Sequence, residues 1–335
     1  MHLPLLYISD RLPKSENNKR FKKKDFTPDI IPWLADPEIA IANARYRNPM
    51  LNFVALSGAA LGSELTYFSL VSLLYSSFSR KTALSLLSMM MPSVIVNQIF
   101  KRSFKFSRPP EKAIHRLAYI ARDDPTFPSG HAQNAVVLGI FAARQMKTPA
   151  TKLGSILLAV IIPWSRVYLG THYPRDAVAG ALLGTGVAFA VSSSEKPFKK
   201  WWNSKPRGLR SLSFALTCLI AGFLTRTPIA AYSCAIGGGL AVGYDLSKPL
   251  LDSNPLPTKR SRILNGITGL VMFIGTAAIT RPLLHRKSTR AASLAGVIVG
   301  LMLTLGIPAA NKFILKWSDL LGLDEDEKKQ YEGSK

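Results

Sequence analysis

Residues 153–194 read LGSILLAVIIPWSRVYLGTHYPRDAVAGALLGTGVAFAVSSS, and this stretch decides the fold class of the chain. Two apolar runs, 153–164 and 177–194, lie on either side of the charged segment SRVYLGTHYPRD at 165–176. In a lipid bilayer an apolar run is expected to be a helix, because a helix pairs its own backbone polar groups. The stretch therefore predicts two membrane helices joined by a charged connection.

The same apolar pattern recurs along the whole chain. Of its 335 residues 47% are hydrophobic, and the mean hydropathy of +0.15 is high for a water-soluble protein. Seven further runs carry almost no charge, at 51–79 (broken by Glu64), 82–100, 131–143, 211–225, 227–244, 263–280 and 291–311. Runs of roughly 17 to 25 apolar residues match the hydrocarbon thickness of a bilayer. The sequence thus predicts an all-α, polytopic membrane protein with about nine spans, five in a first bundle and four after it.

Changes in composition divide the chain into five parts. We predict a polar basic tail at 1–35, a core with an interfacial helix and five spans at 36–193, a basic connecting loop at 194–210, C-terminal membrane spans at 211–316 and a charged tail at 317–335. The first thirty residues lack an apolar core, so no cleavable signal peptide is expected. Gly296-x-x-x-Gly300 in the last span predicts close packing of helices.

The net charge of +23 comes from 43 Lys and Arg against 20 Asp and Glu. Most of this charge falls in the connections between apolar runs, where a membrane protein keeps it hydrated. No RNA-binding signature accompanies it, so the expected partner is the membrane bilayer and not a nucleic acid. The sequence does not determine the oligomeric state.

Three polar clusters lie at the ends of predicted spans. They are Lys101-x6-Arg108-Pro109, Pro128-Ser-Gly-His131 and Ser165-Arg166-x5-His172-x3-Asp176. Counting spans, the first cluster closes the second span, the next opens the third, and the last joins the fourth to the fifth. All three clusters therefore emerge on one face of the membrane, where they can meet.

The cations in these clusters predict a site for an anion. Lys101, Arg108 and Arg166 supply three positive charges, and the planar fork of arginine matches phosphate oxygens. Ser129 and Gly130 add a hydroxyl and a closely approaching backbone at a helix N-terminus, which favours negative charge. These five residues form a candidate phosphate cradle.

Two histidines accompany the cradle. If a helix begins near Pro174, Asp176 lies in its first turn and can accept a hydrogen bond from one nitrogen of His172. The other nitrogen then keeps a free lone pair, which makes His172 a candidate nucleophile with Asp176 as its orienting partner. His131 is placed to protonate a leaving oxygen as general acid. Since no His, Cys or Asp cluster has the spacing of metal ligands, neither a metal nor a cofactor is expected.

The three clusters, complete and in this order, resemble the three signature motifs of the type-2 phosphatidic-acid phosphatase superfamily. The resemblance covers about residues 50 to 193, and eleven specified residues make coincidence negligible. It implies a helical bundle that hydrolyses phosphate monoesters or diphosphates without metal, through a phosphohistidine. In this chain the implied nucleophile is His172 with Asp176 as partner, and His131 is the implied general acid. The implied cradle is Lys101, Arg108, Ser129, Gly130 and Arg166.

Several functions are compatible with this resemblance. The first is a lipid phosphatase acting on phosphatidate, lysophosphatidate, a sphingoid-base phosphate or a polyprenyl diphosphate. The same residues would serve a phosphotransferase with an alcohol acceptor, and a lipid-binding or transport protein could retain the site. A vanadate-dependent haloperoxidase shares the site, but membrane embedding argues against it. A layout of nine spans is similar to glucose-6-phosphatases, and extra C-terminal spans also occur among sphingoid-base phosphate phosphatases.

The orientation in the membrane rests on two conflicting signals. The resemblance implies that the clusters face the extracytoplasmic side, and the basic loops on the opposite side then agree with the positive-inside tendency. The basic run at 19–24, however, would then have been translocated with the N-terminus. We expect the extracytoplasmic face, in either a bacterial inner membrane or a eukaryotic endomembrane.

Overall fold

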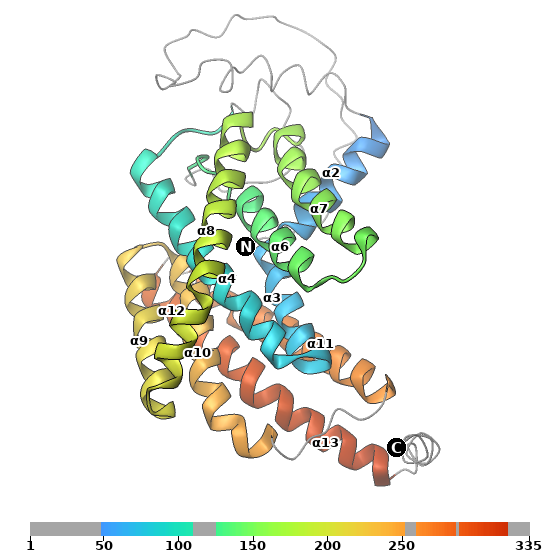
Figure 1. The fold of residues 1–335 in the computed structure, drawn as a ribbon. Helices are drawn as coiled ribbons and strands as arrows, with labels where there is room; N and C mark the ends of the chain where they lie inside the picture. The colour runs from blue at the N-terminus through green and yellow to red at the C-terminus, as the bar shows by residue number, and fades with distance from the viewer. Residues whose placement is uncertain (1–47, 110–124, 252–258, 286–287, 321–335) are drawn as a thin grey trace, which may run out of the picture. The chain divides into compact units, whose positions relative to one another are not determined.

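The computed structural model describes residues 48–109, 125–251, 259–285 and 288–320, and every regular element in these ranges is a helix (Figure 1). The predicted basic tail, the interfacial helix and most of the charged C-terminal tail lie outside these ranges. The helices are α2 (Pro49–Leu61), α3 (Glu64–Leu73), the π-helix η3 (Leu74–Phe78), α4 (Arg80–Phe104), α6 (Gly130–Gln145), α7 (Pro149–Tyr168), α8 (Pro174–Asn203), α9 (Arg207–Leu224), α10 (Pro228–Leu251), α11 (Lys259–His285), α12 (Thr289–Leu301), the π-helix η4 (Met302–Gly306) and α13 (Ile307–Leu320).

The apolar helices confirm the predicted class, an all-α polytopic membrane protein. Within the described residues, 7 helical segments are long and apolar enough to cross a membrane, or up to 8 if α2 and the following α3–η3 form one broken span. By this measure of length and composition, one of the nine predicted spans falls short. The difference lies at 131–143, where α6 has 16 residues and a length of about 24 Å at 1.5 Å per residue. That length is shorter than the ~30 Å hydrocarbon layer.

Residues at the helix starts explain where these helices begin. The side chain of Asn48 accepts a hydrogen bond from the backbone N–H of Leu51 at 2.8 Å, and Pro49 occupies the first position of α2. At the start of α7, the Thr148 side chain caps the helix and Pro149 occupies its first position. A polar cap accepts an otherwise unpaired N–H, and proline needs no partner for its nitrogen, so both sequences favour a helix start.

The segment predicted as a connecting loop at 194–210 is largely helical. Helix α8 continues to Asn203 and α9 starts at Arg207, so the break between them is only a few residues long. The stretch 192–203 contains no glycine and carries glutamate and lysines, which are good helix formers, and the helix also accommodates Pro197. Ser194 donates its hydroxyl to the carbonyl of Ala190 at 2.8 Å, which gives this polar side chain a partner on the helix itself.

The chain forms two compact units whose boundaries fall inside helices. The first unit contains residues up to 63 together with 99–186, and the second contains 64–98 together with 187 onward. Helices α4 and α8 each contribute to both units. We predicted a single core at 36–193, whereas in the structure residues 64–98 group with the C-terminal helices.

In the first unit, α7 packs against α2 and α6. Small residues allow these approaches, since a Cβ on Gly58 would lie 3.1 Å from Ser165 and one on Gly139 would lie 2.8 Å from Ala159. The hydroxyl of Tyr168 donates to the side chain of Asn52 at 2.9 Å and so ties the end of α7 to α2. These contacts hold the end of α7, from which the charged connection starts.

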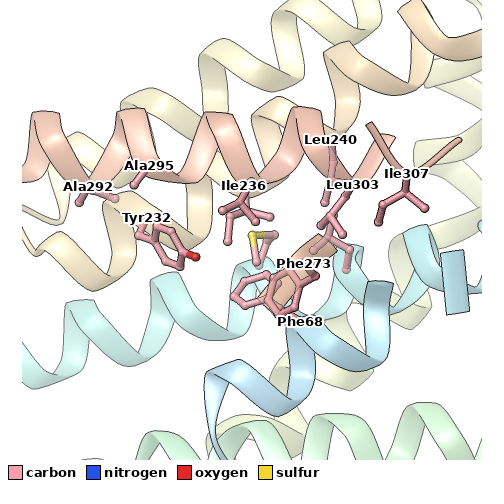
Figure 2. Packing of buried hydrophobic residues seen from close by; sticks show 13 residues of the cluster. Phe68, Tyr232, Ile236, Leu240, Phe273, Ala292, Ala295, Leu303 and Ile307 are labelled. Atoms are coloured by element: carbon pink, nitrogen blue, oxygen red, sulfur yellow. The ribbon is translucent and has the colours of Figure 1, made fainter. Parts of the chain in front are cut away.

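The second unit has its own core, in which α10 packs against α9 and α12. Figure 2 shows part of this core, where Phe68, Tyr232, Ile236, Phe273 and Leu303 come together from different helices. A Cβ on either glycine of the Gly296-x-x-x-Gly300 pair would collide with α10, on the carbonyls of Tyr232 and Ile236 respectively. The predicted close packing around this pair is therefore confirmed.

Candidate active site

His172 lies in the short connection between α7 and α8. Gly170 has a φ of 72°, a left-handed conformation that glycine adopts without strain, and it turns the chain at the end of α7. The backbone N–H groups of Thr171 and His172 then both donate to the carbonyl of Arg166, at 3.0 and 3.2 Å. The connection is thus folded back on the last turn of α7, and the imidazole of His172 is almost completely buried.

Asp176 lies in the first turn of α8, which begins at Pro174 as predicted. Its carboxylate oxygen Oδ2 accepts the backbone N–H of Tyr173 at 2.9 Å. The distance from His172 Nδ1 to Asp176 Oδ2 is 3.5 Å, longer than an ordinary N–H···O hydrogen bond. The predicted direct hydrogen bond between these two side chains is therefore wrong in this structure, although they are neighbours as expected.

A hydroxyl group that the sequence analysis missed lies beside both side chains. Thr126 Oγ1 is 3.1 Å from His172 Nδ1 and 2.5 Å from Asp176 Oδ2. Thr126 is fully buried, and its backbone N–H donates to the carbonyl of Phe106 at 2.9 Å. In the sequence, its place two residues before Pro128 was the one available signal, since a threonine alone carries no motif.

Lys101 and Arg108 are anchored on carbonyl groups around His172. Lys101 Nζ donates to the carbonyl of Pro125 at 2.9 Å, and Arg108 NH1 donates to the carbonyl of Thr171 at 2.8 Å. The same NH1 lies 3.2 Å from His172 Nε2. An arginine fork can only donate, so Nε2 is the ring nitrogen that carries the lone pair. The structure therefore brings the first and third clusters together, with one cation donating to His172 Nε2.

The second cluster lies at the N-terminus of α6. The Ser129 side chain caps this helix by accepting the N–H of Ala132, and the Ser129 backbone N–H donates to the carbonyl of Asp176 at 2.9 Å. Gly130 is the first residue of the helix and His131 the second. Helix α8 approaches so closely that a Cβ on Gly180 would collide with the Ser129 carbonyl. This contact joins the second cluster to the start of α8.

His131 lies beside Gly62, in the break between helices α2 and α3. A Cβ placed on Gly62 would come within 3.0 Å of the His131 ring. Its charge environment includes Arg166, Lys101 and Arg108, whose positive charges all act on its ring. The structure thus places His131 within electrostatic reach of the same cations that surround His172.

Burial, and after it the neighbouring charges, lower the pKa of His172. Burial is the main cause, because it disfavours the charged imidazolium, and it holds the pKa of His172 well below its usual range. Neighbouring cations act in the same direction, in the order Arg108, Arg166 and Lys101. His172 is therefore uncharged at neutral pH, so that its lone pair is available.

Arg175 occupies the other side of Asp176. Its Nε lies 3.6 Å from Asp176 Oδ1, and its guanidinium group lies over the rings of Phe106 at 4.8 Å and Tyr173 at 5.2 Å. Stacking on two rings holds the cation against the carboxylate. Of the two arginines in the charged connection, Arg166 thus belongs to the surroundings of both histidines, whereas Arg175 belongs to Asp176.

A neutral histidine beside several cations, at the ends of membrane helices, is typical of proteins that bind anions at a membrane surface. Comparisons with known proteins make this more specific. A model of the PAP2 superfamily matches residues 82–200. Phosphatidylglycerophosphatase B of Bacillus subtilis (strain 168) is 28% identical over 181 residues, which make up 50% of this chain and 86% of that protein.

Two further similarities are with a relative's sequence and with a solved structure. The putative undecaprenyl-diphosphatase YbjG of Escherichia coli (strain K12) is 30% identical over 171 residues, which make up 50% of this chain and 77% of that protein. The crystal structure of a transmembrane PAP2-type phosphatidylglycerolphosphate phosphatase from Bacillus subtilis has a TM-score of 0.42 and 25% identity to this chain, and the match covers 49% of this chain and 85% of that chain. The chain belongs to the PAP2 superfamily and is an integral, multi-pass membrane protein. The membrane face of its site stays a prediction.

Proposed function

We propose that this protein is a membrane phosphatase that hydrolyses a phosphate monoester or diphosphate on a lipid, through a phosphohistidine at His172. The observation that carries the proposal is the position of Arg108 NH1, 3.2 Å from His172 Nε2. A phosphate oxygen bound to this guanidinium group lies next to the lone pair that would attack phosphorus. Holding the reacting atoms close together in this way accounts for a large part of the acceleration in many enzymes, and Arg108 would pass its donor from Nε2 to the phosphate oxygen.

The cations would hold the phosphate while His172 attacks. Lys101, Arg108 and Arg166 would bind its oxygens, together with the Ser129 hydroxyl and the Gly130 N–H at the start of α6. The Ser129 oxygen accepts the N–H of Ala132, which leaves its own O–H free to donate to a phosphate oxygen. Positive charge and preorganised donors in a site with little water stabilise the charge that develops on the phosphoryl oxygens.

The reaction would proceed in two displacements. His172 Nε2 forms a bond to phosphorus while the ester P–O bond breaks, and the leaving oxygen takes a proton from His131. His131 must be protonated for this step, and the negative charge of the bound phosphate would favour that form by offsetting the surrounding cations. Water then attacks phosphorus as His131 takes back a proton, the N–P bond breaks and inorganic phosphate is released. Asp176 stabilises the positive charge that His172 carries in the intermediate.

The position of the site favours a substrate anchored in the membrane. His172 lies directly between α7 and α8, both long and apolar enough to span a bilayer, so a lipid headgroup could reach the cations while its tail stays among acyl chains. The names of the relatives, a phosphatidylglycerophosphatase and a putative undecaprenyl-diphosphatase, support the same substrate class. We infer a lipid phosphate or diphosphate and leave the choice among these lipids to experiment.

The substrate class can be tested with the purified full-length chain in mixed micelles. We expect phosphate release from phosphatidate, lysophosphatidate, a sphingoid-base phosphate or a polyprenyl diphosphate to exceed release from glucose 6-phosphate at equal concentration. The measured quantity is kcat/KM for each substrate, because this ratio reports discrimination. Equal or faster turnover of the sugar phosphate would exclude the lipid assignment.

A second test concerns metal ions. We expect hydrolysis to continue in excess EDTA, because cationic side chains would supply the positive charge that a metal provides in other phosphatases. In the part of the chain that the structure describes, no group of three or more His, Cys, Asp or Glu side chains could hold a metal ion. The measurement is phosphate release before and after chelation, with added Mg²⁺ as the control. Loss of activity in EDTA that magnesium restores would contradict the prediction.

A further inference from the structure

We propose that Thr126 is a positioning residue, whose hydroxyl group connects His172 to Asp176 and holds the imidazole in the attacking orientation. The inference rests on the proposed function, since it assigns the means by which the nucleophile is oriented. It adds a bridge of two hydrogen bonds to the ion-pair contact between His172 and Asp176.

The bridge follows from three distances. His172 Nδ1 and Asp176 Oδ2 are 3.5 Å apart, whereas Thr126 Oγ1 is 3.1 Å from the nitrogen and 2.5 Å from the oxygen. Both contacts of the hydroxyl fall within ordinary hydrogen-bond lengths or shorter, and the direct contact does not. The hydroxyl therefore links the two side chains by hydrogen bonds, while the carboxylate also acts on the imidazole as a charge 3.5 Å away.

The direction of each hydrogen bond can be assigned from the chemistry of the groups. Arg108 NH1 can only donate, so His172 Nε2 accepts and the ring proton of the neutral imidazole is on Nδ1. Nδ1–H then donates to Thr126 Oγ1. The hydroxyl in turn donates its own proton to the carboxylate of Asp176, which has no proton to offer when ionised. In this assignment His172 Nδ1 and the Thr126 hydroxyl each donate one hydrogen bond, and the Asp176 carboxylate accepts.

The surroundings of Thr126 hold its hydroxyl in place. The side chain is fully buried, and the backbone N–H is bound to the carbonyl of Phe106. The carbonyl of the preceding residue, Pro125, accepts from Lys101 at 2.9 Å. The short segment that carries Thr126 therefore also carries an anchor of the cationic cradle, so the orientation of the nucleophile and the position of the cations are set by one piece of backbone.

During attack the bridge would stabilise the product of the step. Bond formation between Nε2 and phosphorus leaves His172 positively charged, with its proton still on Nδ1. That proton becomes a better donor to Thr126, and the hydroxyl becomes a better donor to the negative Asp176. Chains of hydrogen bonds polarise one another in this way. Removal of the hydroxyl should therefore slow the chemical step more than it weakens substrate binding.

The test compares variants that separate the hydroxyl from the shape of the side chain. Thr126→Val keeps the branched shape without the hydroxyl, and Thr126→Ser keeps the hydroxyl without the methyl group. We expect the valine variant to lose about 10- to 100-fold in kcat with little change in KM, as for loss of a hydrogen bond to a charged group. We expect serine to restore kcat to within about threefold of the parent. Thr126→Cys is a second variant without a strong hydroxyl donor, in case valine prevents folding.

A matched control removes another buried threonine hydroxyl. Thr280 is buried in α11, and its hydroxyl donates to the carbonyl of Thr276 at 2.8 Å, far along the chain from the site. Thr280→Val should leave kcat near that of the parent. A loss in the serine variant with full activity in the valine variant would show that shape alone matters, and would overturn the proposal.

A double-mutant cycle with Asp176→Asn separates positioning from a general structural role. If Thr126 acts through Asp176, the valine substitution should cost less than about threefold in the asparagine background, because coupled residues give non-additive effects. An undiminished loss in that background would overturn the proposal. Failure of the proposed function looks different, since the parent protein itself would then release no phosphate, or His172→Ala would retain turnover. Normal parent activity with an unaffected valine variant would reject the bridge alone.

Discussion

Replacement of His172 by alanine is expected to remove both turnover and the phosphorylated intermediate. The variant loses the side chain proposed to attack phosphorus in the first step, and the loss should be of the order of 10⁵- to 10⁶-fold in kcat, as for removal of nucleophiles in other covalent catalysts. Burial and neighbouring cations hold the pKa of His172 low, so the reactive neutral form exists throughout the neutral pH range in the parent. The measurement is steady-state phosphate release, with trapping of ³²P-labelled protein under alkaline quench, where phosphohistidine survives.

The control is the corresponding change at the other histidine. His131→Ala should slow an alkyl phosphate by about 10²- to 10⁴-fold, the usual contribution of a general acid, and a p-nitrophenyl ester should recover much of this loss because its leaving group needs no proton. His172→Ala should show no such recovery. Equal recovery in both variants, or a labelled phosphoenzyme in His172→Ala, would show that the two roles are assigned incorrectly.

Replacement of Asp176 by asparagine should have the second largest effect. Asparagine can keep one acceptor oxygen for Tyr173 N–H and the Thr126 hydroxyl, which both bind Oδ2 in the parent, so the backbone turn should survive. The negative charge is lost, and the imidazolium that forms during attack has no counter-charge. The loss in kcat should approach about 10⁴-fold, the magnitude known for the analogous change in a serine-protease triad.

Two measurements make this prediction specific. The KM of the asparagine variant should change little, since the cationic cradle is intact, and its phosphoenzyme should form slowly instead of disappearing. Asp245→Asn in α10 is a matched control, because it removes one carboxylate charge from the second unit. A fall in activity of the same size in both variants would point to a general electrostatic effect and contradict the proposed role of Asp176.

The class of fold was predictable because it depends on properties that each segment carries by itself. An apolar run such as 211–225 is a helix in a membrane whatever its neighbours are, and it is α9 in the structure. The helix start at Pro174 was equally local, and with it the place of Asp176 in the first turn. The helix predicted at 131–143 is α6 in the structure, but the helical course of 194–203 was missed, since polar residues at the end of an apolar run indicate a boundary without locating it.

Much of the candidate site was predictable as well. The spacing of the three clusters placed each at the end of a span, and counting spans placed them on one face, so Lys101, Arg108 and His172 were expected to meet. The structure brings these three together around the carbonyls of Pro125 and Thr171. The catalytic roles of these residues stay predictions, because geometry alone does not report a reaction.

Local sequence thus sufficed to predict the membrane class, the starts of several helices and the residues that gather at one site. Two features emerged from the folded chain alone: residues 64–98 join the C-terminal helices, and the Thr126 hydroxyl lies between His172 and Asp176. The physical reason is the range over which each feature is determined. Hydropathy and capping act within a few residues, whereas the contact of Thr126 with Asp176 joins residues 50 positions apart and depends on where the backbone of another segment comes to lie. A carbonyl such as that of Pro125 has no side-chain signature at all, so its part in holding Lys101 could come only from the folded chain.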